Sequence, residues 1–256
     1  NARLLERARE LRVKMTPLDE SELAVILRKN KMRVLFKKRD ITARILRGRI
    51  IFRGKGRGKN TVIALARFAA QNRIPFLDSL ASLSRSGKTC YLPTVELKNA
   101  RHLPTIFCEQ ANDLPPKIFF KPPFFVKPAH GKRHRGVKII RKISELKNKK
   151  WRPILIQPFL HFENEYRVLV LGERILAIAG RSDHRIAGRS DLPRKIQNEA
   201  LRICRALEIE LGGVDFARIG RTFYFLEANR ACGICGVERE TGVDGSGAII
   251  RFVLEK

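Results

Sequence analysis

Residues 212–244, GGVDFARIGRTFYFLEANRACGICGVERETGVD, contain two apolar segments separated by a short turn. Segments 214–218 and 222–226 are rich in β-branched and aromatic side chains, which favour strands, and Gly220 lies between them. Two such segments joined by a short connection that contains glycine are typical of a β-hairpin. We therefore predict a hairpin in the C-terminal part of the chain.

Three polar side chains interrupt the apolar pattern of this hairpin: Asp215, Glu227 and Asn229. Glu227 and Asn229 are two residues apart and so share a strand face, and a three-residue loop would place Asp215 directly opposite Glu227. Facing carboxylates repel each other, and a hard divalent cation such as Mg²⁺ would offset the repulsion. The alternative is that both acids are solvated on an exposed face. The hairpin considered without other evidence favours this alternative, because charged residues are mostly exposed.

The charge of the chain is strongly positive. Its 256 residues include 53 Lys and Arg against 25 Asp and Glu, which gives a formal net charge of +28. Such an excess predicts an acidic partner, which could be nucleic acid, an anionic surface, an acidic peptide or nucleotide phosphates. A bias toward solubility is the alternative, since long basic side chains lie readily along any protein surface.

Membrane and secreted classes are disfavoured by the sequence. No apolar run approaches the ~20 residues that span a bilayer, and the first residues lack the apolar core of a secretory signal. Five cysteines without framework spacing argue against a disulfide scaffold, and the pair Cys232 and Cys235 lacks the further ligands of a structural zinc site. We therefore expect a cytoplasmic protein with no membrane partner.

Apolar spacing predicts an alternation of helices and strands in the first 74 residues. Helices are expected at residues 4–11, 23–27 and 61–71, and strands at 32–36 and 45–52.

The glycine-rich loop at residues 53–59, RGKGRGK, does not match the known phosphate-binding templates. A P-loop would need glycine in place of Arg53 and Ser or Thr in place of Asn60. Seven basic residues and no acids lie between Arg44 and Lys59, so a polyanion contact and a plain surface loop stay open as equal alternatives.

Further elements follow in the second part of the chain. We predict a strand, a loop and a second strand over residues 124–140, and a short buried strand at 154–160. A hairpin is expected with Gly172 at the first central position of its turn. Pro193 can open a helix that ends before Gly212.

The order of these motifs resembles the RimK-like branch of the ATP-grasp carboxylate–amine ligases. The sequence has V-D, then E-x-N, then a glycine-rich bend and G-x-E-x-x-T-G-V-D, as the family does. In that family the Asp, Glu and Asn hold magnesium ions against the ATP phosphates. The resemblance therefore implies that Asp215, Glu227 and Asn229 are metal ligands.

The resemblance also implies an ATP site. The family pattern K-P-x-x-G-S-x-G-x-G-V is matched at Lys127, Pro128, Gly131, Gly136 and Val137, whereas Lys132 and His134 depart from it. Residues that would contact ATP, from its phosphates to the adenine hinge and the ribose hydroxyls, are Lys88, Lys127, Gly131, Gly136, Gln157, Phe159 and Glu165. Arg167 and Arg181 would face the reacting carboxylate and the phosphates as catalytic residues.

The fold implied by the resemblance is the α+β ATP-grasp fold, in which two α+β subdomains grip ATP. A small α/β domain that lacks its first strand would precede them. The expected boundaries are 1–79 for this first domain, 80–156 for the subdomain with the phosphate flap, and 157–256 for the subdomain with the magnesium site.

The activity implied is an ADP-forming ligation of a carboxylate to an amine through an acyl phosphate. The cofactors would be ATP and two Mg²⁺ ions, with Mn²⁺ able to substitute, and the reaction would add an amino acid such as glutamate to an acidic peptide or protein. The rival interpretation is a basic nucleic-acid or ribosome-associated protein that keeps the scaffold without catalysis. Contact with RNA or a ribosome through the basic N-terminal region and a homo-oligomer stay open.

Overall fold

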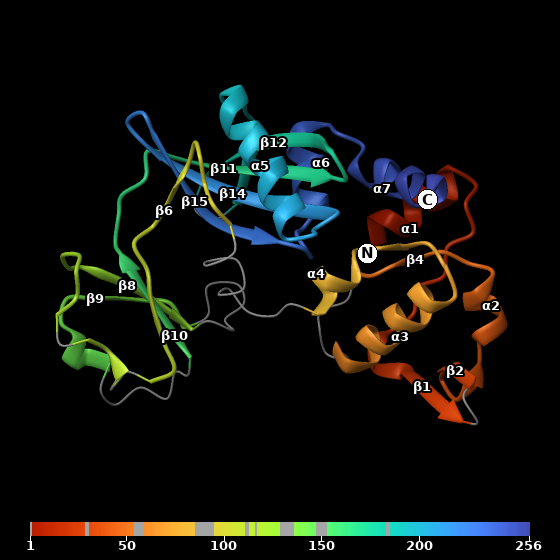
Figure 1. Ribbon diagram of the computed structural model, residues 1–256. Helices are drawn as coiled ribbons and strands as arrows, with labels where there is room; N and C mark the ends of the chain where they lie inside the picture. The colour runs from red at the N-terminus through yellow and green to blue at the C-terminus, as the bar shows by residue number, and fades with distance from the viewer. Residues whose placement is uncertain are drawn as a thin grey trace.

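The computed structural model of the chain describes residues 2–28, 31–53, 59–84, 95–110, 113–115, 117–128, 136–146, 153–182 and 185–256. Helices and strands in these ranges form an N-terminal region, a small four-stranded sheet and a large six-stranded sheet covered by helices (Figure 1). This mixture agrees with the α+β class predicted from the sequence.

The large sheet has the strand order β13-β12-β11-β14-β15-β6, and its pairs are antiparallel except for β15 with β6. Its strands are β6 (Arg101–His102), β11 (Asn164–Leu171), β12 (Arg174–Ser182), β13 (Arg185–Arg189), β14 (Leu211–Ile219) and β15 (Thr222–Asn229). The turn between β11 and β12 consists of Gly172, whose φ is 56°, and Glu173, which confirms the predicted hairpin.

The predicted hairpin of β14 and β15 is confirmed, but its loop differs from the expected one. The loop has two residues, Gly220 and Arg221, rather than three, and Gly220 adopts a φ of 55° that suits glycine. A bulge directly after Asp215 shifts the register by one residue. This shift restores the predicted pairing of Asp215 with Glu227.

Helices cover both faces of the large sheet. Helix α5 (Arg194–Ala206) packs against one face, where Ile196, Ile203 and Phe216 share a core, and its position confirms the helix predicted after Pro193. On the other face lie α6 (Cys235–Thr241) and α7 (Gly245–Glu255), together with α1 (Ala2–Glu10) from the start of the chain. The helix expected at residues 4–11 is therefore confirmed, and it packs beside α7 (Figure 1).

The small sheet has the order β7-β10-β8-β9. Its strands are β7 (Ile106–Cys108), β8 (Phe124–Pro128), β9 (Lys138–Ile140) and β10 (Ile154–Pro158), and the 3₁₀-helix η3 (Ile143–Leu146) follows β9. Buried Val126, Ile140 and Ile156 form its core. The strands predicted within 124–140 and 154–160 are therefore confirmed, while the predicted flap loop at 129–135 lies outside the described residues.

The N-terminal region combines a three-stranded antiparallel sheet with a short parallel pair. Its elements are η1 (Glu20–Glu22), β1 (Leu23–Arg28), β2 (Lys31–Phe36), β3 (Arg39–Asp40), α2 (Thr42–Leu46), β4 (Ile50–Ile51), α3 (Lys59–Gln71), β5 (Phe76–Leu77) and α4 (Leu80–Ser84). The predictions of a strand at 32–36 and a helix at 61–71 are confirmed.

Two predictions for this region are wrong. Residues 23–27 form strand β1 rather than a helix, because this apolar run pairs with β2 along its whole length, and tertiary pairing overrides a short helical spacing. Residues 45–52 do not form one strand: they contain the end of α2 and the two-residue strand β4.

Among the described residues, none of the helices combines the length and apolarity needed to cross a bilayer. The predicted domain boundaries stay a prediction.

Candidate functional site

A buried carboxylate lies at the centre of the large sheet between two arginines. Asp215 is 0% exposed and accepts hydrogen bonds from Arg167 Nε at 2.7 Å and Arg167 Nη2 at 2.6 Å. Arg181 Nη1 donates to the same carboxylate at 2.7 Å. The side chains of Arg167 and Arg181 are 14% and 9% exposed, so the whole group is nearly removed from water.

Strand register places these side chains next to one another. Asp215 on β14 pairs with Arg167 on β11 and with Glu227 on β15, so three neighbouring strands contribute one side chain each. Arg181 on β12 pairs with Glu165 on β11, and the Arg181 Nη1 lies 3.8 Å from the Glu165 carboxylate. Because side chains alternate along a strand, this group lies on the face opposite α5.

Burial and ion pairing act in opposite directions on this group. Burial raises the pKa of the Asp215 carboxyl, and the hydrogen bonds and charges of the two guanidiniums oppose that rise. For Arg167, burial favours the neutral form, but the hydrogen bonds and charge of Asp215 outweigh it and raise the pKa. A buried group of this kind is costly to break, because removing one partner leaves the other charge without compensation.

Glu227 and Asn229 extend the group toward the end of β15. The Asn229 amide nitrogen donates to Glu227 Oε1 at 2.7 Å, and both side chains are half-buried. The amide oxygen of Asn229 is therefore the atom that would coordinate a cation. Two carboxylates and one amide oxygen are the hard ligands that suit magnesium.

The residues present fit magnesium. Asp215 Oδ1 accepts one hydrogen bond and Oδ2 accepts two, so Oδ1 keeps a lone pair for a cation. Within the described residues, Arg181 Nε is buried without a hydrogen-bond partner. A guanidinium with an unused donor suits an incoming oxyanion, such as a carboxylate or a phosphate.

The residues predicted to bind adenine and phosphate lie on the small sheet, apart from this group. Lys127 is a buried residue of β8, and its ammonium lies 5.7 Å from the ring centroid of Phe125. Gln157 on β10 is buried and donates from Nε2 to Thr105 Oγ1 at 2.9 Å. Phe159 follows β10, and its backbone N–H donates to the Pro123 carbonyl at 2.9 Å.

Two predicted phosphate contacts, Lys88 and Gly131, lie outside the described residues. Gly136, which follows the predicted flap loop, has a φ of 81°. L side chains rarely adopt that conformation, so a glycine is favoured where the chain enters β9.

Sequence reasoning missed the contacts that hold the loop after Asn229. Arg53 Nη1 donates to the Arg230 carbonyl at 3.4 Å, and Arg53 Nη2 donates to the Cys232 carbonyl. The guanidinium of Arg53 therefore ties β4 to the end of the candidate site. The sequence signalled only a basic loop at this position.

A glycine in β14 allows the loop and Arg167 to approach closely. A Cβ atom added to Gly213 would lie 2.8 Å from the Cβ of Cys232 and 3.3 Å from Arg167 Nε. The adjacent glycines of this strand were the available signal, since glycine inside a strand often marks a close approach.

Asp244 and Glu238, near the end of the segment 212–244, have a structural role that the sequence did not reveal. Asp244 caps α7 by accepting from the Gly247 N–H at 2.9 Å, and Arg7 of α1 donates to it from Nη2 at 2.8 Å. Glu238 Oε1 accepts from the Ser246 N–H at 2.5 Å. These two acids fix the start of α7 and the position of α1.

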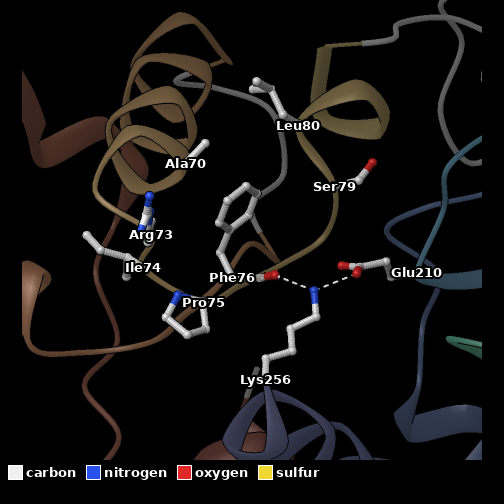
Figure 2. A pocket seen from close by; sticks show the side chains of 9 residues that line it. All are labelled: Ala70, Arg73, Ile74, Pro75, Phe76, Ser79, Leu80, Glu210 and Lys256. Carbon is white, nitrogen blue, oxygen red and sulfur yellow. Dashed lines mark hydrogen bonds and ion pairs between the residues drawn. The ribbon is translucent and has the colours of Figure 1, made fainter.

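A pocket of about 470 Å³ lies between the N-terminal region and the far end of β14 (Figure 2). Lys256 Nζ lies there, at 2.8 Å from the Phe76 carbonyl and 2.5 Å from Glu210 Oε1. Its lining residues are Ala70, Arg73, Ile74, Pro75, Phe76, Ser79, Leu80, Glu210 and Lys256. None of the predicted site residues is among them, so this pocket is separate from the arginine–carboxylate group.

Comparison with known proteins gives a family match over most of the chain. A family model described as the RimK-like ATP-grasp domain matches residues 96–253. A probable alpha-L-glutamate ligase of Xanthomonas oryzae pv. oryzae is 30% identical over 154 residues, which cover 52% of this chain and 51% of the relative.

A second curated relative and a solved structure add to this match. The ribosomal protein bS6–L-glutamate ligase of Escherichia fergusonii is 29% identical over 113 residues, or 39% of this chain and 38% of the relative. The chain thus spans about half the length, or less, of these curated relatives. The ATP-grasp ligase PsnB, solved with a variant of its minimal precursor, Mg and ADP, matches with a TM-score of 0.76 at 12% identity, covering 99% of this chain and 93% of that one. This likeness confirms the ATP-grasp fold predicted from the sequence.

Proposed function

Because the chain belongs to the RimK-like ATP-grasp family, we propose that it is an ADP-forming carboxylate–amine ligase. The reaction would transfer the γ-phosphoryl group of ATP to a carboxylate, and an amine would then displace phosphate from the acyl phosphate to form an amide. The observation that carries the proposal is the buried group of Arg167, Arg181 and Asp215, beside Glu227 and Asn229.

The two arginines are proposed to stabilise the reacting carboxylate and the transferring phosphoryl group. Both guanidiniums lie in a nearly water-free place, where a fixed positive charge interacts more strongly with a developing negative charge than it would in water. The unused Nε of Arg181 supports this role, because it offers one more donor to an oxyanion. Phosphoryl transfer depends mainly on positioning and electrostatics, which such donors supply.

Asp215, Glu227 and Asn229 are proposed to hold magnesium. Magnesium, when bound, neutralises phosphate charge and orients the phosphates for in-line transfer. The cross-strand pairing of Asp215 with Glu227 supports the assignment, because it keeps the two carboxylates on one face. We also propose that two Mg²⁺ ions bind and that Mn²⁺ can replace them.

ATP is proposed to lie between the small sheet and this group. Lys127, Gln157 and Phe159 would contact ATP from the small sheet, and Glu165 would take the ribose hydroxyls from the large sheet. Buried Lys127 and Gln157 are held at fixed positions on adjacent strands, as a preformed binding site requires. Lys88, Gly131 and Gly136 stay predicted phosphate contacts.

The proposed substrates are an amino acid such as glutamate and an acidic peptide or protein. The names of the two glutamate ligases support the first, and the net charge of +28 supports the second. The same charge favours a rival proposal, in which the chain binds RNA or a ribosome without catalysis.

A product assay separates the two proposals. The protein would be incubated with ATP, Mg²⁺, each amino acid and a glutamate-rich peptide, and the peptide would be analysed by mass spectrometry while ADP is measured. We expect one amino-acid residue to be added per ADP formed. The matched variant Arg181→Lys keeps the charge but lacks Nε, and we expect it to lose most turnover while it retains ATP binding. Absence of both ADP and product with every amino acid, together with tight RNA binding, would favour the rival.

A further inference from the structure

Strand β1 lies at an open edge of the N-terminal sheet. The order of that sheet is β1-β2-β3, and among the described strands only β2 pairs with β1. Figure 1 shows β1 at the lower margin of the molecule, with α3 on its inner side. Its six residues, Leu23–Arg28, all have register partners in β2, so the strand is regularly paired and long enough to pair with another strand.

The register defines which backbone groups face outward. The Lys37 N–H donates to the Glu22 carbonyl at 3.1 Å, which makes this a hydrogen-bonded position of the antiparallel pair. Hydrogen-bonded and non-hydrogen-bonded positions alternate along such a pair. The N–H and C=O groups of Leu23, Val25 and Leu27 therefore point away from β2, toward the open edge.

The edge lacks the backbone features that normally prevent pairing. Strands at sheet edges are usually protected by proline, a bulge or an inward-pointing charge, and β1, with the sequence LAVILR, has no proline and a regular register. Ile26 and Leu27 are instead 41% and 72% exposed. Exposed apolar side chains beside open backbone groups are typical of a strand that receives a peptide.

The charge around this edge is positive. From Glu22 to Asp40 the sequence has seven basic and two acidic residues. Both acids lie near basic partners: Lys37 Nζ is 3.4 Å from Glu22 Oε1, and Arg33 Nε is 3.9 Å from Asp40 Oδ2. The surface around β1 therefore presents an excess of positive charge to any strand that approaches.

We propose that the open edge of β1 binds an extended acidic peptide as an added strand. The outward N–H and C=O groups of Leu23, Val25 and Leu27 would form the new ladder, the exposed apolar side chains would contact alternate apolar residues of the peptide, and the basic residues would pair with its acids. The docking site stands on these observations alone. Its identification as the place where the acceptor binds rests on the proposed ligase function.

A second copy of the chain fits this edge less well. Pairing of β1 with β1 of another copy would bring two sheets of like charge together, and facing like charges destabilise paired strands. An acidic peptide reverses the sign of that interaction. Charge complementarity therefore selects the peptide over self-association.

Fluorescence anisotropy with a labelled peptide of alternating glutamate and valine tests the proposal. Val25→Pro removes one outward N–H without removing a bond to β2, and we expect it to weaken peptide binding about tenfold. Val25→Ala keeps that N–H and should bind within about twofold of the parent. Arg28→Glu combined with Lys31→Glu should also weaken binding, and it keeps the test decisive if the proline variant does not fold.

Amide exchange measured by NMR in the unaltered protein gives a second readout. Addition of the peptide should protect the N–H groups of Leu23, Val25 and Leu27, while those of Ala24 and Ile26, which already point toward β2, should change little. Equal peptide affinity in the proline, alanine and charge-reversed variants would overturn the proposal. The proposal would also be overturned if ultracentrifugation showed concentration-dependent dimerisation through β1 and the peptide did not protect these N–H groups.

The outcome can be separated from that of the ligase proposal. ATP affinity by calorimetry should be unchanged in all β1 variants, because β1 contributes no residue to the proposed nucleotide site. Peptide binding without product formation would retain the docking edge and contradict the ligase function. Product formation that is unaffected by the β1 variants would retain the ligase and contradict the docking edge.

Discussion

Arginines pair with acids in two regions of the molecule that differ in burial. In the large sheet, Arg167 and Arg181 are almost buried and bind a fully buried Asp215 at 2.6 to 2.7 Å. In the N-terminal sheet, the side chain of Arg33 is 70% exposed and lies 3.9 Å from Asp40. The same two residue types therefore form a rigid group in one region and a loose surface pair in the other.

The difference in burial determines what each Arg–Asp pair can contribute. A buried pair has fixed geometry, and breaking it is strongly destabilising, so it can position reacting groups. An exposed pair contributes at most about 1 kcal/mol to stability, but its charge acts over a Debye length of about 8 Å in physiological salt and can attract a partner. The large sheet is thus suited to chemistry and the N-terminal sheet to recognition.

The largest effect is expected from Arg167→Met, which leaves buried Asp215 with Arg181 alone. The variant should lose about 3 to 5 kcal/mol of unfolding free energy, measured by urea denaturation. Burial raises the pKa of Asp215, and this rise is less opposed without Arg167. A folded-state pKa above the unfolded value favours folding at low pH. The loss of unfolding free energy in the variant, relative to the unaltered protein, should therefore shrink as the pH falls from 7 toward 4. A loss that is independent of pH would contradict this account.

A somewhat smaller loss is expected from Asp215→Asn. Two facing acids taken alone would repel, so neutralising one would stabilise the hairpin. The structure reverses that sign, because the change leaves two buried guanidiniums without their carboxylate. We expect a loss of about 3 kcal/mol in thermal or urea unfolding without metal, and no turnover. The matched variant Glu227→Gln, at a half-buried position, should lose under about 1 kcal/mol and also turn over poorly. A more stable Asp215→Asn protein would contradict the paired arrangement.

An intermediate effect is expected from Arg53→Ala. The change removes two hydrogen bonds to the carbonyls of Arg230 and Cys232, and should cost about 1 to 2 kcal/mol. Differential scanning calorimetry would measure it, with exposed Arg49→Ala as the control that should stay within about 0.5 kcal/mol. Equal unfolding temperatures for the two variants would mean that Arg53 behaves as a surface charge after all.

The smallest effect on stability is expected from Arg33→Ala, at under about 0.5 kcal/mol, since its pair with Asp40 is exposed. Binding of an acidic peptide should nevertheless fall steeply as salt rises, because it depends on exposed charge. Nucleotide binding among buried groups should respond less. A titration of both ligands in low and moderate salt would compare them, and equal salt dependence would remove the distinction between the two regions.

Local pattern alone was sufficient for several elements. The apolar strands on either side of Gly220, the helix after Pro193 and the turn at Gly172 were predicted because their periodicity and turn residues agree with their final environment. It failed at residues 23–27 and 45–52, where short apolar runs fit both a helix and a strand. There the decision came from pairing with a distant segment, as for β1 with β2.

The motif order in the sequence determined the family, the fold class and the set of candidate residues. Only the tertiary structure decided that Asp215 binds arginines 48 and 34 positions away in the chain. It also decided that Arg53 is a structural contact and that the edge of β1 is open. The physical reason is that periodicity fixes which face a side chain occupies, whereas strand order and register, set by contacts between distant segments, fix which side chains meet there.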